Sequence, residues 1–280
     1  MKNLATLIII LFFTGTAFSQ NKGNTTSTDS VIMHKHAPRR VAETQPSTYE
    51  VVQSIEANMV SIPGGSFTMG CANDDDTDCY YWEKPAHVVT VGNFYIGKYP
   101  VTQREWEAIV GPNKYSYRNC PDCPVENVSW YDAQVFINKL NQLTGNNYRL
   151  PTAAEWEYAA GGGTHSHGYK YAGDNDINKV AWYSKNSGQK TQPVGQKKPN
   201  ELGLFDMCGN VWQWCSDWFN DKYYSNSPAN NPTGATRATY RCLRGGSWWS
   251  EAKDCRVVNR DRYPPAARDD DVGFRLARDW

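Results

Sequence analysis

The sequence has no excess charge of either sign. Its 29 basic residues balance its 29 acidic residues, so the formal net charge is zero. Proteins that bind nucleic acids or anionic membranes attract them with basic patches, and this composition supports neither partner. Histidine is also scarce, with five residues in the chain. The pairs His34/His36 and His165/His167 lie in polar stretches without apolar periodicity, which favours solvated segments over metal sites.

Long apolar runs are absent after the first 20 residues. Met1-Lys2-Asn3 precedes an apolar run from Leu4 to about Phe18, and small residues flank its end. This pattern is typical of a secretory signal peptide, and the run is too short for an ordinary membrane-spanning helix. An uncleaved anchor is the alternative, and no Cys follows the run to carry a lipid. We predict a signal peptide over 1–19, no membrane span in the mature protein, and a secreted or periplasmic location.

Residues 20–58 are mostly Ser, Thr, Asn, Gln and Lys, without an apolar period. Such a composition cannot bury enough apolar surface to fold, so we predict a disordered polar linker here. The folded domain is expected to occupy residues 59–280. After export about 260 residues remain, enough for one large domain or two small ones.

Eight cysteines in an exported chain predict disulfide bonds. Cys71 and Cys79 bracket an acidic loop, and Cys120 and Cys123 form a second local pair. The acidic loop lacks the ligand spacing of a calcium-binding loop. Four more cysteines follow, and the sequence does not fix how they pair: Cys208, Cys215, Cys242 and Cys255.

The pattern of the first half of the domain predicts both strands and helices. Residues 59–62 and 66–69 flank Pro63-Gly64-Gly65, which predicts a hairpin. Residues 88–91 and 94–96 are two further predicted strands. Later predicted strands are shorter and more scattered: 180–183, 211–214 and the alternating segment 273–278.

Three capping boxes predict three helices. The pairs of capping residues are Thr102 with Glu105, Ser129 with Asp132, and Thr152 with Glu155. The second helix has the clearest apolar stripe, formed by Ala133, Phe136, Ile137, Leu140 and Leu143. In the third, Trp156 and Ala159 are expected to face the core.

The segment from Arg244 to Arg256 combines the most unusual local features of the chain. Gly245 and Gly246 permit backbone torsions that other residues avoid, so they predict a sharp turn. Two tryptophans follow, Trp248 and Trp249, of which we expect one to be buried and one exposed. A polar run then leads from Ser250 to the thiol of Cys255.

The segment from Gly203 to Trp214 places oxygen-bearing side chains on either side of a glycine-containing turn. Asp206 and Gln213, with backbone carbonyls between them, have the donor types that calcium prefers. The alternative is that both side chains hydrogen-bond the backbone of the turn, and spacing alone favours this alternative.

Seven motifs, in order, resemble those of the sulfatase-modifying factor family, which contains the formylglycine-generating enzyme. They are Ile62-Pro63-Gly64-Gly65-Ser66-Phe67-Thr68-Met69-Gly70, Pro100-Val101-Thr102, Pro124-Val125-Glu126-Asn127-Val128-Ser129-Trp130, Arg149-Leu150-Pro151-Thr152-Ala153-Ala154-Glu155-Trp156-Glu157, Gly209-Asn210-Val211-Trp212-Gln213-Trp214, Arg244-Gly245-Gly246-Ser247-Trp248 and Gly273-Phe274-Arg275. The resemblance covers roughly residues 59–277. It implies an α+β fold, a variant of the C-type lectin fold with little regular secondary structure.

The resemblance also implies two metal sites. One is a calcium site formed by the side chains of Asp206 and Gln213 and the carbonyls of Gly209 and Val211; Gln213 stands where the family has Glu, which removes a charge. The other is the Cu(I) site of the oxidases, which lies between two cysteines spaced five apart.

Cys255 matches the second copper cysteine, whereas Ser250 stands at the position of the first. Ser247 matches a residue of the family's oxygen pocket. Cu(I) prefers soft thiolates, and a serine hydroxyl is a hard donor, so we predict that copper binding and oxidase activity are lost. Cys255 is then free to pair with another cysteine, such as Cys215.

Two classes of function remain. The first is a ligand-binding or cell-envelope structural module of a bacterial type, whose surface would take a peptide, protein or glycan. The expected ligand-binding residues are Trp249, Glu251, Asp254, Arg260, Arg262 and Tyr263. The second is a copper-dependent oxidase that converts a substrate cysteine to formylglycine. We favour the first, and the sequence sets no oligomeric state.

Overall fold

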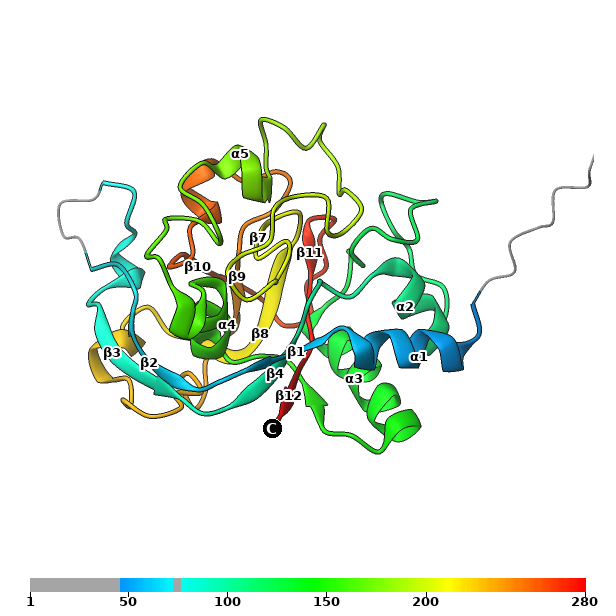
Figure 1. Cartoon of the computed structure of the whole chain (residues 1–280), viewed down its shortest axis with the longest axis horizontal. Helices are drawn as coiled ribbons and strands as arrows, with labels where there is room; N and C mark the ends of the chain where they lie inside the picture. Colours follow the sequence, from blue (N-terminus) through cyan, green and yellow to red (C-terminus); the bar gives the residue numbers. More distant parts are fainter. Residues whose placement is uncertain (1–45, 73–76) are drawn as a thin grey trace, which may run out of the picture. The chain divides into compact units, whose positions relative to one another are not determined.

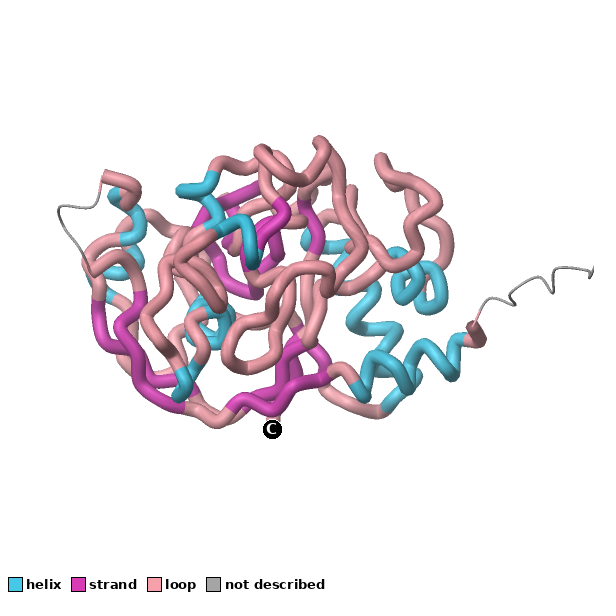
Figure 2. The backbone as a smooth tube through the Cα atoms, turned by 45° about the horizontal axis from the view of Figure 1, so that its top comes forward, coloured by secondary structure: helices cyan, strands magenta, loops and turns pink. Residues whose placement is uncertain are grey.

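The structure is a computed structural model that describes residues 46–72 and 77–280. The predicted signal peptide and most of the predicted linker lie outside the described residues. In the described part, short helices and strands are joined by long loops, as Figures 1 and 2 show. This confirms the predicted α+β class.

Two four-stranded sheets form the framework. The first has the order β1-β4-β12-β5, and the second has the order β10-β9-β8-β11. The strands of the first are β1 (Met59–Ile62), β4 (Phe94–Gly97), β12 (Ala277–Asp279) and β5 (Tyr148–Arg149). Those of the second are β10 (Arg260–Tyr263), β9 (Tyr240–Arg244), β8 (Trp212–Phe219) and β11 (Val272–Gly273). Two pairs complete the strands: β2 (Gly65–Met69) with β3 (His87–Val91), and β6 (Ala181–Trp182) with β7 (Cys208–Gly209).

The predicted hairpin between residues 59–62 and 66–69 is wrong. Strand β1 pairs with β4, and β2 pairs with β3, in one antiparallel register that runs through both ladders. Residues 59–69 therefore form one interrupted strand along residues 87–97. Pro63 cannot donate a hydrogen bond to the ladder. Gly64 lies so close to the backbone of Val91 that a Cβ atom would come within 2.5 Å of its carbonyl oxygen.

The predicted terminal strand over residues 273–278 is divided between the two sheets. Strand β11 lies parallel to β8 in the second sheet. Strand β12 lies between β4 and β5 in the first sheet. The residues between them cross from one sheet to the other, and Arg275 is fully buried at this crossing.

The three predicted helices are confirmed. They are α2 (Gln103–Ile109), α3 (Trp130–Thr144) and α4 (Ala153–Ala160), and each has both hydrogen bonds of its capping box. Trp156 and Ala159 are fully buried, as expected. Leu140 is buried, but Leu143 in the last turn of α3 is 56% exposed. The buried stripe therefore ends at Leu140 and lacks its last predicted member.

A further helix, α1 (Thr48–Ala57), lies in the stretch predicted to be a disordered linker. Val51, Val52 and Ile55 are buried in one core cluster with residues of α2. Ser47 and Glu50 form a capping box, which is a signal that the polar composition obscured. The predicted domain boundary at residue 59 is therefore too late. The remaining helical segments are α5 (Ile177–Val180), η1 (Tyr81–Glu83), η2 (Gly163–His165), η3 (Tyr223–Asn226) and η4 (Ala252–Cys255).

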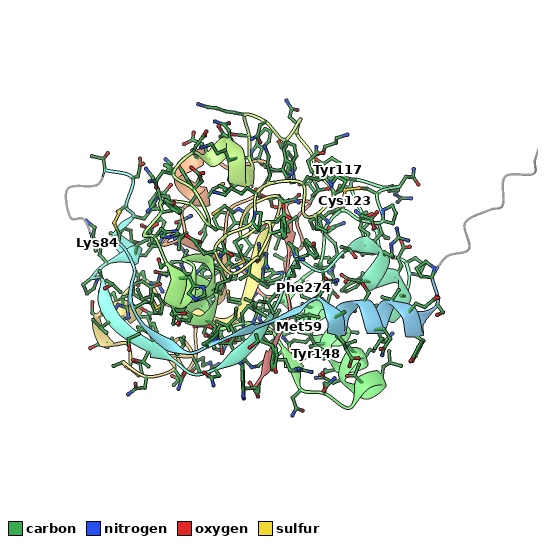
Figure 3. The ribbon with its side chains drawn as sticks, viewed as in Figure 1. Met59, Lys84, Tyr117, Cys123, Tyr148 and Phe274 are labelled. Atoms are coloured by element: carbon green, nitrogen blue, oxygen red, sulfur yellow. A yellow bond between two sulfur atoms is a disulfide. The ribbon has the colours of Figure 1, made fainter. Side chains whose placement is uncertain are left out.

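Large aromatic residues and buried arginines fill the core. Trp156 and Trp214 are fully buried, and each indole N–H donates a hydrogen bond, to Gln213 and to the carbonyl of Val128. Phe274, labelled in Figure 3, packs against the rings of Trp106 and Phe136.

Both local cysteine pairs are confirmed as disulfides, Cys71–Cys79 and Cys120–Cys123. Within the described residues, no helix has the length and apolar character needed to cross a membrane.

Candidate functional site

The turn at Gly245 and Gly246 is as sharp as the sequence predicts. Both residues have positive φ angles, 96° and 72°. A Cβ atom on Gly245 would lie 2.9 Å from the carbonyl oxygen of Met207, and one on Gly246 would lie 2.7 Å from the sulfur of Cys255. Both positions therefore require glycine for conformation and for space.

Arg244 anchors this turn to α4. Its guanidinium group is fully buried and forms an ion pair with Glu157 at 2.7 Å. It also donates to the carbonyls of Val258 and Asn259. Glu157 accepts a second hydrogen bond, from the backbone N–H of Gly70. The turn, α4 and the end of β2 are thus held at fixed positions by one charged pair.

Ser247 and Ser250 belong to one hydrogen-bonded network. The Oγ atom of Ser250 accepts a bond from the backbone N–H of Ser247 at 3.0 Å and lies 3.1 Å from its hydroxyl. The Ser247 hydroxyl donates to the carboxylate of Asp271 at 2.7 Å. Burial raises the pKa of Asp271 to about 6. The oxygen of Ser250 is therefore engaged in closing the turn.

The thiol of Cys255 is fully buried and is not disulfide-bonded. Burial raises its pKa well above the ordinary value, which keeps it protonated. Cys215, its suggested partner, lies instead beside Cys242. One buried, neutral thiol and one hydrogen-bonded hydroxyl do not fit Cu(I), which prefers two thiolates.

The predicted calcium ligands come together, but their side chains do not present a free oxygen cluster. Gln213 donates through Nε2 to the carbonyl of Asp206 at 2.8 Å. Its Oε1 atom accepts bonds from Trp156 at 2.8 Å and from Arg275 at 2.6 Å. The carboxylate of Asp206 accepts bonds from Gly195 and Asn210.

Because the cationic Arg275 occupies the oxygen of Gln213, this donor set does not fit calcium. Gly209 and Val211, whose carbonyls complete the predicted site, are also buried. The alternative interpretation is correct only in part. Gln213 bonds the backbone of the turn at Asp206, whereas the carboxylate of Asp206 accepts from Gly195, outside the turn, and from the side chain of Asn210.

The predicted ligand-binding residues differ in their exposure and in their partners. Trp249 is 64% exposed and Trp248 is buried, which confirms the expected division. Glu251 is exposed and pairs with Lys253. Asp254 accepts a hydrogen bond from the hydroxyl of Tyr80.

The three predicted residues of β10 differ in burial and in partners. Arg260 is 3% exposed and donates to the carbonyls of Trp82 and Asn220, so it is a structural residue and not a surface contact. Tyr263 donates to Asp269. Arg262 lies over the rings of Trp82 and Phe219, at 5.0 and 5.1 Å.

Arg262 lines a hollow of about 320 Å³, called here the Arg262 pocket. Its other main lining residues are Tyr81, Phe219, Asp221, Arg237 and Tyr240. Tyr81 is 65% exposed and Tyr240 is 39% exposed. Among the described residues, the guanidinium groups of Arg237 and Arg262 have no hydrogen-bonded or ion-paired partner. The sequence identified Arg262 alone, because the other residues come from distant segments.

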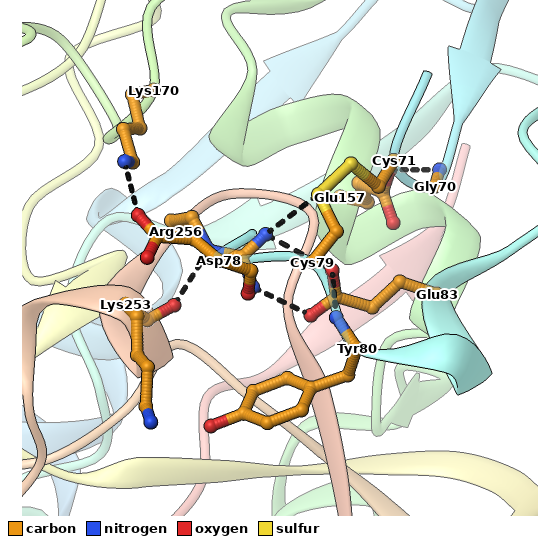
Figure 4. The surroundings of a disulfide bond; sticks show 10 residues. All are labelled: Gly70, Cys71, Asp78, Cys79, Tyr80, Glu83, Glu157, Lys170, Lys253 and Arg256. Atoms are coloured by element: carbon orange, nitrogen blue, oxygen red, sulfur yellow. Dashed lines mark hydrogen bonds and ion pairs between the residues drawn. A yellow bond between two sulfur atoms is a disulfide. The ribbon is translucent and has the colours of Figure 1, made fainter. Parts of the chain in front are cut away.

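A hollow of about 530 Å³ lies beside the Cys71–Cys79 disulfide and is lined in part by Glu157, Lys170 and Arg256. In Figure 4, Arg256 forms a buried bidentate ion pair with Glu83, and Lys170 pairs with Asp78. Arg256 and Lys170 are therefore each engaged with a carboxylate.

The chain matches one protein family over most of its length. The family of the sulfatase-modifying factor enzyme 1-like domain matches residues 44–280, and the chain belongs to this family. The match begins before α1, in agreement with the corrected boundary.

Named relatives fall into more than one functional group. The chain is 31% identical to the chaperone protein LppX of Paenibacillus barcinonensis, over 80% of this chain and 90% of LppX. It is 29% identical to the formylglycine-generating enzyme of Thermomonospora curvata, over 81% of this chain and 95% of that protein. Among solved structures, Treponema denticola variable protein 1 superimposes with a TM-score of 0.72 and 32% identity, over 79% of this chain and 95% of that one. These similarities confirm the predicted family and fold.

Proposed function

We propose that this protein is an exported member of the family that lacks oxidase activity and binds a peptide, protein or glycan ligand. The observation that carries the proposal is Ser250. Its hydroxyl replaces one of the two thiolates that the family's copper site needs, and it is bonded to Ser247. The remaining thiol, Cys255, is buried and protonated.

Two features support export. The apolar run at residues 4–18 has the pattern of a signal peptide. Disulfides such as Cys71–Cys79 and Cys120–Cys123 persist in oxidising compartments. A secreted or periplasmic location therefore agrees with both.

The Arg262 pocket supports a binding role. Exposed aromatic rings provide large contact areas, and unpaired guanidinium groups can form charge-assisted hydrogen bonds with a ligand. The rings of Trp82 and Phe219 hold Arg262 in place before a ligand arrives. One relative is named a chaperone, which agrees with a polypeptide ligand.

The test of lost oxidase chemistry compares the wild-type protein with Ser250→Cys and Ser250→Ala. Each is loaded with Cu(I), dialysed and assayed for bound copper, and then for conversion of a cysteine in a sulfatase-type peptide to an aldehyde. We expect stoichiometric copper in Ser250→Cys alone, because this change restores a thiol pair. Aldehyde formation by the wild-type protein would establish the alternative, a formylglycine-generating oxidase.

The test of binding uses glycan and peptide arrays. A ligand of the Arg262 pocket should bind the wild-type protein and an Arg104→Ala control, but not Arg262→Ala, because Arg104 pairs with Asp122 and does not line the pocket. The melting temperature of each variant shows that it is folded. The binding proposal fails if no array member distinguishes Arg262→Ala from the control.

A further inference from the structure

Two of the four unbonded cysteines lie on neighbouring strands of the second sheet. Cys215 is on β8 and Cys242 is on β9. The antiparallel register pairs Gln213 with Arg244 and Trp214 with Leu243, and it shifts before Phe219. The next positions along the two strands are Cys215 and Cys242.

The two thiols are neighbours, because each shifts the pKa of the other, and both residues are at most 1% exposed. Each donates to a backbone carbonyl on its own strand, Cys215 to Gln213 and Cys242 to Leu243. By contrast, Cys208 accepts a bond from the backbone N–H of Ala172 at 3.2 Å. Cys255 lies on η4, outside the sheet that carries Cys215 and Cys242.

The spacing of neighbouring strands suits a covalent bond. Directly opposed residues on antiparallel strands have Cα atoms about 4.5–5.5 Å apart. Disulfides span Cα distances of roughly 4.4–6.8 Å. If the register of Gln213 and Trp214 continues by one residue, Cys215 lies opposite Cys242, at a separation that a disulfide can span.

We propose that Cys215 and Cys242 are oxidised to a third disulfide, which links β8 to β9 beneath α4. The oxidant is an external disulfide, carried by a thiol oxidoreductase or by oxidised glutathione. Each cysteine loses one proton, the new bond forms between the two Sγ atoms, and the two electrons reduce the external disulfide to two thiols. The exchange proceeds through a mixed disulfide with one of the two cysteines.

Because both sulfurs are buried in the folded domain, the exchange must take place while the strands are still accessible during folding.

The experiment counts thiols in the full-length protein, expressed with its leader in an oxidising compartment and purified without reductant. The protein is denatured and alkylated before reduction. We expect Cys208 and Cys255 to be alkylated and the other six cysteines to be protected. A non-reduced tryptic digest should contain the peptide Cys242–Arg244 attached to the peptide that carries Cys208 and Cys215.

Two variants assign the bond. The attached peptide should persist in Cys208→Ser and disappear in Cys215→Ser. If Cys215→Ser does not fold, fragment ions between residues 208 and 215 of the wild-type digest give the same assignment. Alkylation of all four cysteines after treatment with oxidised glutathione during refolding would overturn the proposal, and so would a bond from Cys242 to Cys208 or Cys255.

Discussion

The buried ion pair between Arg244 and Glu157 is expected to be a main determinant of stability. Replacement of Glu157 by Ala removes the carboxylate that lies 2.7 Å from the guanidinium group and leaves a buried positive charge without a counter-charge. The backbone N–H of Gly70 also loses its acceptor. Breaking one side of a buried pair costs about 3–5 kcal/mol.

The measurement is the free energy of unfolding in urea, with the melting temperature as a second readout. For a domain of this size the expected loss corresponds to a fall of roughly 6–20 °C. The matched control is Glu251→Ala, because Glu251 pairs with Lys253 at 3.4 Å on the surface with 74% of its side chain exposed. Exposed pairs contribute little, so the control should unfold like the wild-type protein.

Glu157→Gln separates charge from hydrogen bonding. The amide oxygen can still accept a bond from Gly70, so this variant should lie between the wild-type protein and Glu157→Ala. If Glu157→Ala is no less stable than the surface control, the view that this pair fixes the turn on α4 is refuted.

Three further outcomes follow from the geometry. Gly246→Ala should lower the free energy of unfolding in urea by about 2 kcal/mol or more, because its Cβ would contact the sulfur of Cys255. Gly111 also has a positive φ, 109°, but open space around it, so Gly111→Ala should cost only the backbone strain of that φ. Burial raises the pKa of Glu126 from 4.5 to about 7, so its contribution to stability is complete below pH 4.5 and is lost as the pH rises through 7. Between pH 5 and 8 the melting temperature should therefore fall less in Glu126→Gln than in the wild-type protein. An equal fall in the two proteins would contradict this. Chelation with EDTA should leave the melting temperature unchanged, because Arg275 occupies the oxygen of Gln213, and a fall would show that calcium binds after all.

The sequence predicted best what depends on neighbouring residues. Each capping box lies within four residues, so its hydrogen bonds do not depend on the rest of the fold. The glycine pair at 245 and 246 predicted a turn for the same reason. The family motifs supplied the fold, which local patterns could not.

The failures concern long-range contacts. The two strands around Pro63 resembled a hairpin, but their partners lie across an intervening loop. The oxygen of Gln213 resembled a calcium ligand, but its actual partners are Trp156 and Arg275, which are 57 and 62 residues away. Arg260 resembled a surface residue because a buried arginine cannot be recognised without the carbonyls that receive its hydrogen bonds.

The position of β12 has a consequence for the order in which the domain is assembled. This strand fills the gap between β4 and β5, and the neighbouring Arg275 bonds to the carbonyl of Gly97, 178 residues earlier. Until β12 has left the ribosome, β4 and β5 have an unfilled place between them, and closing so long a loop is slow. The first sheet is therefore among the last parts of this domain to be completed.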